Sequence, residues 1–281
     1  MNKKIKYILL FILVTALFTL WLFWANKALT TREFIITDEK IPSSFDGFKI
    51  AHVSDLHNES FGSGNEKLLT LIEEANPDII ALTGDIIDSS RENIRVVVEF
   101  MTKATEIAPV NYITGNHEPR SVESNTLLNF IEEIGVKMLD NESIPLTRKE
   151  DSISLYGIND PSFAADYFFE EEHVASSLLE RLEKKDGFSI LLSHRPEFFN
   201  LYTEYGFDLV LSGHAHGGQF RFPFTGGLYA PGQGFLPEYE SGLYQDGETS
   251  MVVSRGLGNS TFPLRFNNRP EVIFITLKEA E

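Results

Sequence analysis

Residues 48–57 read FKIAHVSDLH, an apolar run that leads directly into an aspartate and a histidine. A short apolar run between polar residues is typical of a buried strand. The same arrangement recurs in IIALTGDIID at residues 79–88 and in VNYITGNHE at residues 110–118. Each of these predicted strands is therefore followed at once by carboxylate, amide or imidazole side chains, all of which can bind a metal ion.

Two later stretches repeat the arrangement, FSILLSH at residues 188–194 and FDLVLSGHAH at residues 207–216. Between the strands, residues 66–75 and 94–107 show the apolar spacing of amphipathic helices. Strands that alternate with helices predict βαβ units and a mixed α/β sheet covered by helices. Further strands are expected at residues 153–157, 251–254 and 271–277, and a long ordered loop at residues 213–247.

The side chains that follow the strands form one predicted cluster, because ligands of open α/β sheets bind beyond the carboxyl ends of the strands. Its members carry carboxylate, amide and imidazole groups, which suit divalent cations. Two such ions would lie about 3.5–4 Å apart, with one carboxylate able to bridge them. The predicted ligands are Asp55, His57, Asp85, Asn116, His194, His214 and His216.

The histidines support this interpretation, because most of them follow a predicted strand. A single Asp-x-His or Gly-Asp pair is common in ordinary turns, whereas the ordered set of motifs is specific. Five of the seven histidines lie in the motifs, namely His57, His117, His194, His214 and His216. The other two are interpreted as structural, His52 within the first predicted strand and His173 at the start of a surface helix.

In this order, the motifs resemble those of the calcineurin-like metallophosphoesterases, and the resemblance covers nearly everything after residue 26. Three later segments are more narrowly similar to membrane-associated phosphodiesterases of the YkuE/YaeI type. They are HAHGGQ at 214–219, SRGLG at 254–258 and PLRF at 263–266. The resemblance implies a four-layer αββα sandwich, in which two mixed sheets lie face to face with helices outside.

The resemblance also implies a dinuclear centre with a bridging hydroxide. The first ion would be held by Asp55, His57, Asp85 and His216, and the second by Asp85, Asn116, His194 and His214. The catalytic residues would be Asp85, which bridges the ions, and His117, which would protonate the leaving oxygen or contact phosphate. Two divalent ions are expected as cofactors, and Mn, Fe, Zn and Co all suit these ligands.

Several neighbouring residues have less specific roles. Asp88, Glu118 and Asn58 would orient the ligands or simply shape turns. Glu59 stands where many family members carry glycine, which puts the shape of the first loop in question. Two substrate contacts are proposed, Arg255 and Gln219.

For Arg255 the alternatives are a phosphate contact, which a guanidinium makes bidentately, and an ion pair with a carboxylate. The aromatic residues between Phe220 and Tyr244 would form an apolar wall for a lipid or nucleoside, or would simply pack a long loop.

The N-terminus predicts a membrane anchor. Residues 7–26 carry no charge, and about 20 apolar residues cross the hydrocarbon core. Trp21 and Trp24 lie near the far end of this run, where indoles favour the interface. The alternative is a cleaved signal peptide, but the run is long for one and no clear cleavage site follows.

The positive-inside rule orients this single-pass anchor, because three lysines precede the run and fewer basic residues follow it. The N-terminus would be cytoplasmic, and the domain would lie outside the cell membrane. The predicted parts are an anchor at residues 1–26, a connector at 27–47 and a metallophosphoesterase domain at 48–281.

The net charge of −17 disfavours a long nucleic acid as partner, because its phosphates would be repelled. A small phosphoester or a lipid headgroup fits better. The chain has no cysteine, which excludes disulfides and thiolate metal sites. The predicted function is hydrolysis of a phosphodiester or phosphomonoester, with a phospholipid or lipid-linked pyrophosphate as an alternative substrate. The alternative of another class is a non-catalytic metal-binding domain of the cell envelope.

Overall fold

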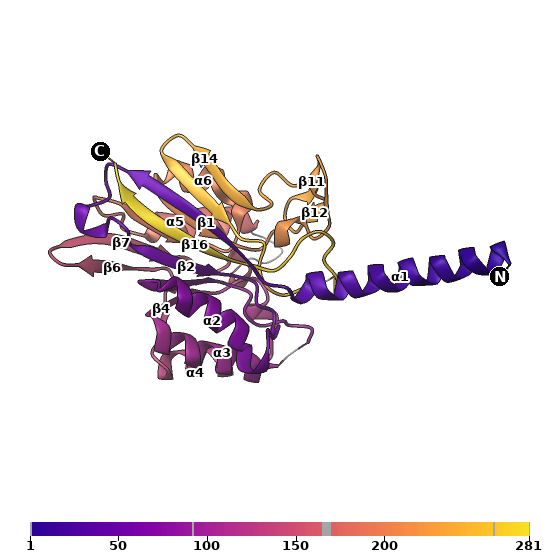
Figure 1. The fold of residues 1–281 in the computed structure, drawn as a ribbon. Helices are drawn as coiled ribbons and strands as arrows, with labels where there is room; N and C mark the ends of the chain where they lie inside the picture. Colours follow the sequence, from indigo (N-terminus) through magenta and orange to yellow (C-terminus); the bar gives the residue numbers. More distant parts are fainter. Residues whose placement is uncertain (1, 92, 165–169, 261, 281) are drawn as a thin grey trace.

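The computed structural model describes residues 2–91, 93–164, 170–260 and 262–280. Two six-stranded sheets lie face to face, and helices cover the outer face of each (Figure 1). This arrangement confirms the four-layer αββα sandwich that the resemblance implies.

The first sheet has the strand order β1-β16-β2-β3-β4-β5. Its strands are β1 (Thr30–Asp38), β16 (Glu271–Glu279), β2 (Lys49–Val53), β3 (Ile79–Thr83), β4 (Val110–Ile113) and β5 (Lys137–Met138). From β2 to β5 the strands are parallel, whereas β16 is antiparallel to β2 and parallel to β1. The carboxyl ends of β2, β3 and β4 therefore lie at one edge of the sheet.

The second sheet has the order β14-β15-β9-β8-β7-β6. Its strands are β14 (Gly242–Asp246), β15 (Thr249–Val253), β9 (Leu209–Ser212), β8 (Ser189–Leu192), β7 (Asp151–Gly157) and β6 (Glu142–Arg148). The four inner strands are parallel, and the two edge strands are antiparallel to their neighbours.

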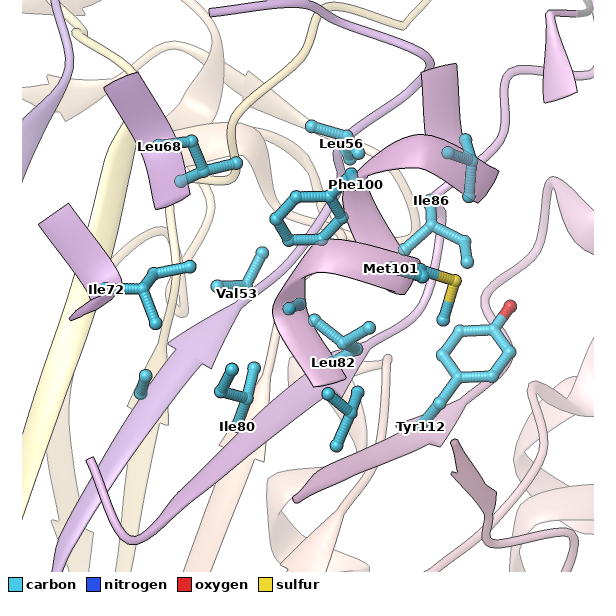
Figure 2. Packing of buried hydrophobic residues seen from close by; sticks show 14 of the residues in the cluster. Val53, Leu56, Leu68, Ile72, Ile80, Leu82, Ile86, Phe100, Met101 and Tyr112 are labelled. Carbon is cyan, nitrogen blue, oxygen red and sulfur yellow. The ribbon is translucent and has the colours of Figure 1, made fainter. Parts of the chain in front are cut away.

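The hydrophobic core has three parts, one between the sheets and one under the helices of each outer layer. On the first sheet, α2 (Glu66–Ala75), α3 (Ile94–Ile107) and α4 (Ser124–Glu133) form the layer. Figure 2 shows Val53 and Leu82 of the strands packed with Phe100 of α3, and all three side chains are fully buried. Each such side chain contributes about 1.5–3 kcal/mol to stability. On the second sheet, α5 (Glu171–Arg181) and α6 (Phe199–Glu204) form the layer.

Two segments differ from the expectation. Residues 27–47, expected to be a connector, contain the nine-residue β1, which pairs with β16 near the C-terminus. Its sequence carries Arg32 and Glu33, so it is not an apolar run, and its partner is distant in the chain. The expected loop at 213–247 contains two short hairpins, β10 (Arg221–Phe222) with β11 (Gly226–Gly227), and β12 (Tyr229–Ala230) with β13 (Gly234–Phe235).

The N-terminal helix α1 (Lys3–Lys27) extends away from the domain (Figure 1). Within the described residues it is the one helix long and apolar enough to cross a membrane. Its large apolar side chains between Tyr7 and Leu20 are exposed, as suits contact with lipid rather than with a protein core.

Candidate metal centre

The carboxyl ends of five strands, three from the first sheet and two from the second, supply the predicted ligands. All seven predicted ligand residues are buried. Six of them, together with His117, form three overlapping groups, and within each group the ligand atoms lie within 4.8 Å of one another. The groups are Asp55 with His57 and His216, His57 with Asp85 and His117, and Asp85 with His194 and His214. Asp85 belongs to two of these groups, as a bridging carboxylate would.

The distances show that imidazole nitrogens and carboxylate oxygens converge. Nε2 of His194 lies 3.3 Å from Oδ2 of Asp85, and Nε2 of His57 lies 3.6 Å from the same oxygen. On the other side, Nε2 of His216 lies 3.4 Å from Oδ1 of Asp55 and 3.3 Å from Nε2 of His57. The contacts around Asp85 and the contacts around Asp55 and His216 therefore meet at His57.

Two buried atoms test whether this site fits metal ions. Oδ1 of Asn116 has no hydrogen-bond partner among the described residues, and Nε2 of His194 makes no hydrogen bond of good geometry there, although Asp85 Oδ2 lies 3.3 Å from it. A buried polar atom without a partner costs free energy, and a cation at the centre of the cluster would supply that partner. The donor set of imidazole, carboxylate and amide also fits a divalent ion. The residues therefore fit a pair of such ions.

Burial and charge prepare the ligands for a cation. Burial lowers the pKa of His57 and of His216 to about 3, so both imidazoles are neutral and able to coordinate. Burial also opposes charge on His194, but Asp85 and then Asp55 raise the pKa of His194 to about 10. Despite its own burial, Asp85 has a pKa well below the ordinary value because of His194. Asp85 is therefore a carboxylate among the imidazoles, and a metal ion would replace the proton of His194.

The loops that carry the ligands have an unusual backbone. Asp55, His57, Asp85, His214 and His216 all have positive φ, between 47° and 64°. Such a conformation is uncommon for residues other than glycine and concentrates at functional sites.

The glycines before two ligands allow close approach. A Cβ at Gly213 would overlap Ser54 Oγ, and a Cβ at Gly115 would overlap Asp85 Oδ1. The loops therefore pack more tightly than a side chain would permit, as the glycine-containing motifs indicate.

His117 lies at the side of this cluster and is held at both ring nitrogens. The backbone N–H of Ser89 donates to Nδ1 at 3.2 Å, so Nδ1 is an acceptor and the proton of the neutral ring is on Nε2. Nε2 lies 3.1 Å from Ser260 Oγ and 4.0 Å from Asp85 Oδ2. The side chain is 13% exposed. His117 therefore presents an N–H to the space beside Asp85.

Glu118 organises the loops around the centre. Its buried carboxylate accepts hydrogen bonds from the backbone N–H groups of Gly115 at 2.7 Å, Ile86 at 2.9 Å and Asp85 at 3.1 Å. Burial, together with the charge of Asp85, raises the pKa of Glu118 to about 8. The residue joins the two loops that carry Asp85 and Asn116.

Asp88 and Asn58 shape their own loop. Asp88 accepts hydrogen bonds from Ser90 N at 2.8 Å and from Arg91 Nη2 at 2.6 Å, and it lies 3.8 Å from His117 Nδ1. Asn58 Nδ2 donates to the carbonyl of Arg91 at 2.8 Å. Glu59, the departure in the first loop, forms an ion pair with Lys27 at the end of α1.

The structure does not bring Arg255 into the cluster. Its Nε lies 3.7 Å from Glu271 Oε2, which is the ion pair considered as the alternative. Gln219 is buried beside His216, but its Nε2 donates to the carbonyls of Phe262 at 3.0 Å and Leu264 at 2.8 Å. The other two histidines are apart from the centre: His52 is buried in β2, and His173 is exposed in α5.

Sequence reasoning missed two buried arginines. Arg195 Nη1 lies 3.3 Å from His214 Nε2, and its guanidinium is paired with Asp160 at 2.6 Å. Arg265 Nη2 lies 3.2 Å from His216 Nδ1. Arg195 follows His194 directly in the chain, which was a usable local signal, whereas nothing local to Arg265 marks its contact with His216.

A cavity of about 290 Å³ opens beside the centre. It is lined by His216, Gln219, Tyr229, Pro231, Ser260 and Phe262. The cavity is therefore lined by a predicted metal ligand, His216, by Ser260, which contacts His117, and by apolar side chains. Such a lining suits a ligand with one polar and one apolar part.

Comparison with known proteins agrees with this geometry. The metallophosphoesterase YkuE of Bacillus subtilis (strain 168) is 35% identical over 254 residues, covering 88% of this chain and 85% of YkuE. The phosphodiesterase YaeI of Escherichia coli (strain K12) is 30% identical over 235 residues, or 82% of each protein. A transmembrane protein with a metallophosphoesterase domain from Danio rerio is 29% identical over 258 residues, covering 86% of this chain and 56% of that protein.

The model of one family, calcineurin-like phosphoesterase, matches residues 48–218. This region is more than half of the chain and contains every predicted metal ligand. The chain belongs to the calcineurin-like phosphoesterase family, as the order of its motifs predicts.

Proposed function

We propose that the protein hydrolyses phosphodiesters or phosphomonoesters at a dinuclear metal centre while tethered to a membrane by α1. The observation that carries the proposal is that Asp85 lies in two of the ligand groups, one with the buried imidazole of His57 and one with those of His194 and His214. Family membership supports a metal-dependent phosphoesterase. The individual metal ligands, the role of His117 and the substrate are part of the proposal.

The first ion is assigned to Asp55, His57, Asp85 and His216, and the second to Asp85, Asn116, His194 and His214. The unpartnered Oδ1 of Asn116, together with Nε2 of His194, supports the second set. When bound, such a pair lowers the pKa of a coordinated water and neutralises charge on the phosphoryl oxygens. Manganese, iron and zinc all suit these ligands.

His117 stabilises the leaving group in this proposal. Its Nδ1 accepts from the Ser89 N–H, so its Nε2–H is directed to the leaving oxygen and donates a hydrogen bond to it in place of Ser260 Oγ. The neutral imidazole keeps this proton, and the positioned hydrogen bond stabilises the negative charge that develops on the leaving oxygen. Glu118 holds the Asp85 and Asn116 loops in register while this occurs.

The membrane part of the proposal rests on α1. Its length and exposed apolar surface support a retained, single-pass anchor, and the lysines before it support a cytoplasmic N-terminus with the domain outside the cell. The catalytic domain is proposed to begin at β1, because this strand is part of the first sheet. A small phosphoester or a lipid headgroup is the proposed substrate, and nucleic acid is not.

The test uses the full chain in detergent, stripped of metal by a chelator and reloaded with Mn²⁺ or Zn²⁺. Hydrolysis of bis(p-nitrophenyl) phosphate and p-nitrophenyl phosphate separates diesterase from monoesterase activity. Asp85→Ala should lose both bound metal and turnover. His117→Ala should keep its metal and lose about 10²-fold or more in kcat, with a larger loss on phenyl phosphate, whose leaving oxygen develops more negative charge and depends more on the hydrogen bond.

His173→Ala is the matched control, because it removes an exposed histidine in α5, away from the cluster. It should behave as the unsubstituted protein. Two bound metals with no turnover on any phosphoester would instead support a non-catalytic metal-binding role. A protein that takes up no metal would overturn the proposal.

A further inference from the structure

An apolar surface is exposed on the side of the domain from which α1 leaves (Figure 1, near β11 and β12). We name it the hairpin surface, and define it by five apolar side chains, each 44–107% exposed, from the β10–β11 and β12–β13 segments and from the loop that follows β15. Its members are Phe222, Phe224, Phe235, Leu236 and Phe262. Several large apolar side chains gathered on one face of a protein mark a contact surface.

Phe224 is the most exposed of these residues. Its side chain is fully exposed at the tip of the first hairpin, and its backbone has a φ of 73°. A bulky residue in this conformation is uncommon and strained. Its ring is not buried in the described core, so contact with an apolar surface outside the domain would remove it from water.

The hairpin surface is continuous with α1. The ring of Phe266 lies 5.7 Å from the ring of Phe222 on one side and 5.7 Å from the ring of Trp21 on the other. It also lies 6.4 Å from the ring of Phe18. Aromatic contacts thus lead from Phe222 of the hairpin surface through Phe266 to Trp21, near the end of the predicted membrane span, and to Phe18, one turn further into it.

Hydrogen bonds fix this arrangement. Asn26, in the last turn of α1, is buried and bonds to the backbone N–H and carbonyl of Arg265, the residue before Phe266. The helix therefore cannot swing freely relative to the loop that carries Phe266.

The depth of the surface follows from helix geometry. Phe18 precedes Asn26 by eight residues, and at 1.5 Å per residue it lies about 12 Å along the helix from the end of the uncharged run. If residues 7–26 cross the hydrocarbon core, Phe18 lies within it. Phe266, in contact with Phe18, is then at hydrocarbon depth too, and its neighbours on the hairpin surface reach the same leaflet.

Basic residues lie where the headgroups would be. The guanidinium of Arg269 is 5.1 Å from the ring of Trp24, near the end of α1. Arg269, Arg255, Trp21 and Trp24 line one cavity of about 400 Å³ beside the helix. Although the net charge of the chain is −17, these two arginines lie beside two tryptophans near the end of α1. Basic and indole side chains at this position fit the phosphate layer of a membrane.

We propose that the hairpin surface rests in the lipid bilayer beside α1, and that the metal centre draws a membrane-resident lipid phosphoester through the cavity at His216. Phe262 belongs to the hairpin surface and also lines that cavity, where Tyr229 and Pro231 lie as well. The phosphoryl group of a lipid would thus reach the metal ligands through this cavity while its acyl chains stay in the bilayer. The substrate part of this inference rests on the proposed function, whereas the bilayer contact does not.

The first experiment measures depth in the membrane and needs no activity. The chain has no cysteine, so Phe224→Cys gives a unique site for an environment-sensitive fluorophore. The matched control is Glu150→Cys, an exposed residue in the turn of the β6–β7 hairpin, at the opposite end of the domain from α1 (Figure 1). In phosphatidylcholine vesicles carrying the full chain, the label at 224 should be blue-shifted and quenched by lipids with a quencher on the acyl chain.

The label at 150 should report water. A label at 224 that reports water as well would overturn the bilayer contact. So would shielding at 224 that grows with the number of protein molecules per vesicle, because that would indicate contact with a second copy of the chain.

The second experiment compares two forms of one substrate, long-chain phosphatidic acid in vesicles and the soluble dihexanoyl form. The double variant Phe224→Ser with Phe235→Ser should lower hydrolysis of the vesicle lipid by about tenfold and leave the soluble form unchanged. Equal losses, or no loss, on the two forms would overturn delivery from the membrane. Absence of turnover on both, with bis(p-nitrophenyl) phosphate still hydrolysed and the label at 224 still shielded, would reject the lipid substrate but keep the hydrolase and the bilayer contact.

Discussion

Asn26 and Arg265, 239 residues apart in the chain, exchange two hydrogen bonds. Asn26 Nδ2 donates to the carbonyl of Arg265 at 2.9 Å, and Asn26 Oδ1 accepts from the Arg265 N–H at 2.7 Å. The guanidinium of Arg265 in turn lies 3.2 Å from Nδ1 of His216. The end of the predicted anchor is therefore connected to the metal centre through one buried arginine.

This connection predicts that Asn26→Leu destabilises the domain. The substitution keeps the branched shape of the side chain but leaves a buried N–H and a buried carbonyl of Arg265 without partners, at a cost of about 1–3 kcal/mol each. The free energy of unfolding of the domain, from denaturant titration in detergent, should fall by about 2 kcal/mol or more. Thr19→Val, which removes only a bond within the helix to Thr15, should have no such effect. Equal stability of the two variants would contradict the connection.

A second prediction concerns the close approach at Gly115. Gly115→Ala should abolish binding of the metal pair, because the new Cβ would overlap Asp85 Oδ1 and displace the shared ligand. Metal content after dialysis measures this. Gly187→Ala is the control, since its Cβ meets open space although its φ is positive. It should cost about 1 kcal/mol of stability and keep the metals. Retention of both ions in Gly115→Ala would contradict the assignment of Asp85.

Glu118 is expected to act as a positioning residue. Glu118→Gln replaces one accepting oxygen with an NH₂ group that faces backbone N–H donors, so the Asp85 and Asn116 loops should shift. We expect metal affinity to fall by about 10–100-fold, measured by titration of the stripped protein with Mn²⁺. Glu123→Gln, where a carboxylate accepts from the backbone N–H of Ile94 away from the centre, provides the comparison. If both variants bound Mn²⁺ equally well, the loops would not depend on Glu118.

We expect buried His52 to account for part of the decrease in the free energy of unfolding at low pH. Burial lowers its pKa to about 3, below the ordinary 6.5, and its Nε2 lies 2.8 Å from Thr83 Oγ1. The unfolded chain therefore takes up this proton first as the pH falls. The contribution of neutral His52 to the free energy of unfolding is fully present above pH 6.5 and is lost progressively toward pH 3. The reason is that the unfolded chain binds the proton in this range and the folded chain does not.

His52→Gln should remove this contribution. The unsubstituted protein should lose about 2 kcal/mol more than the variant between pH 7 and pH 5, measured by denaturant unfolding at both values. His173→Gln, at an exposed position, should follow the unsubstituted protein. Identical pH slopes for His52→Gln and the unsubstituted protein would contradict the prediction.

The sequence alone determined the local units and their order. Apolar runs such as IIALT and the amphipathic pattern of EKLLTLIEEA are encoded over a few residues, and β3 and α2 match them at both ends. The ligand types were also readable, because each follows a strand and divalent ions restrict the chemistry to a few side chains. The uncharged run before the domain similarly predicted the helix α1.

The tertiary structure alone decided which distant parts meet. β1 escaped detection because its partner β16 lies at the other end of the chain, and pairing with it makes a charged segment into a strand. The contact of Arg265 with His216 and the hairpin surface beside α1 have the same origin. Asp55 and His214, which follow strands of different sheets, both have positive φ, and the backbone N–H of His214 donates to the Asp55 carboxylate. Local patterns depend on short-range backbone and side-chain preferences, whereas these contacts depend on burying two whole sheets against each other, a free energy that no short segment contains.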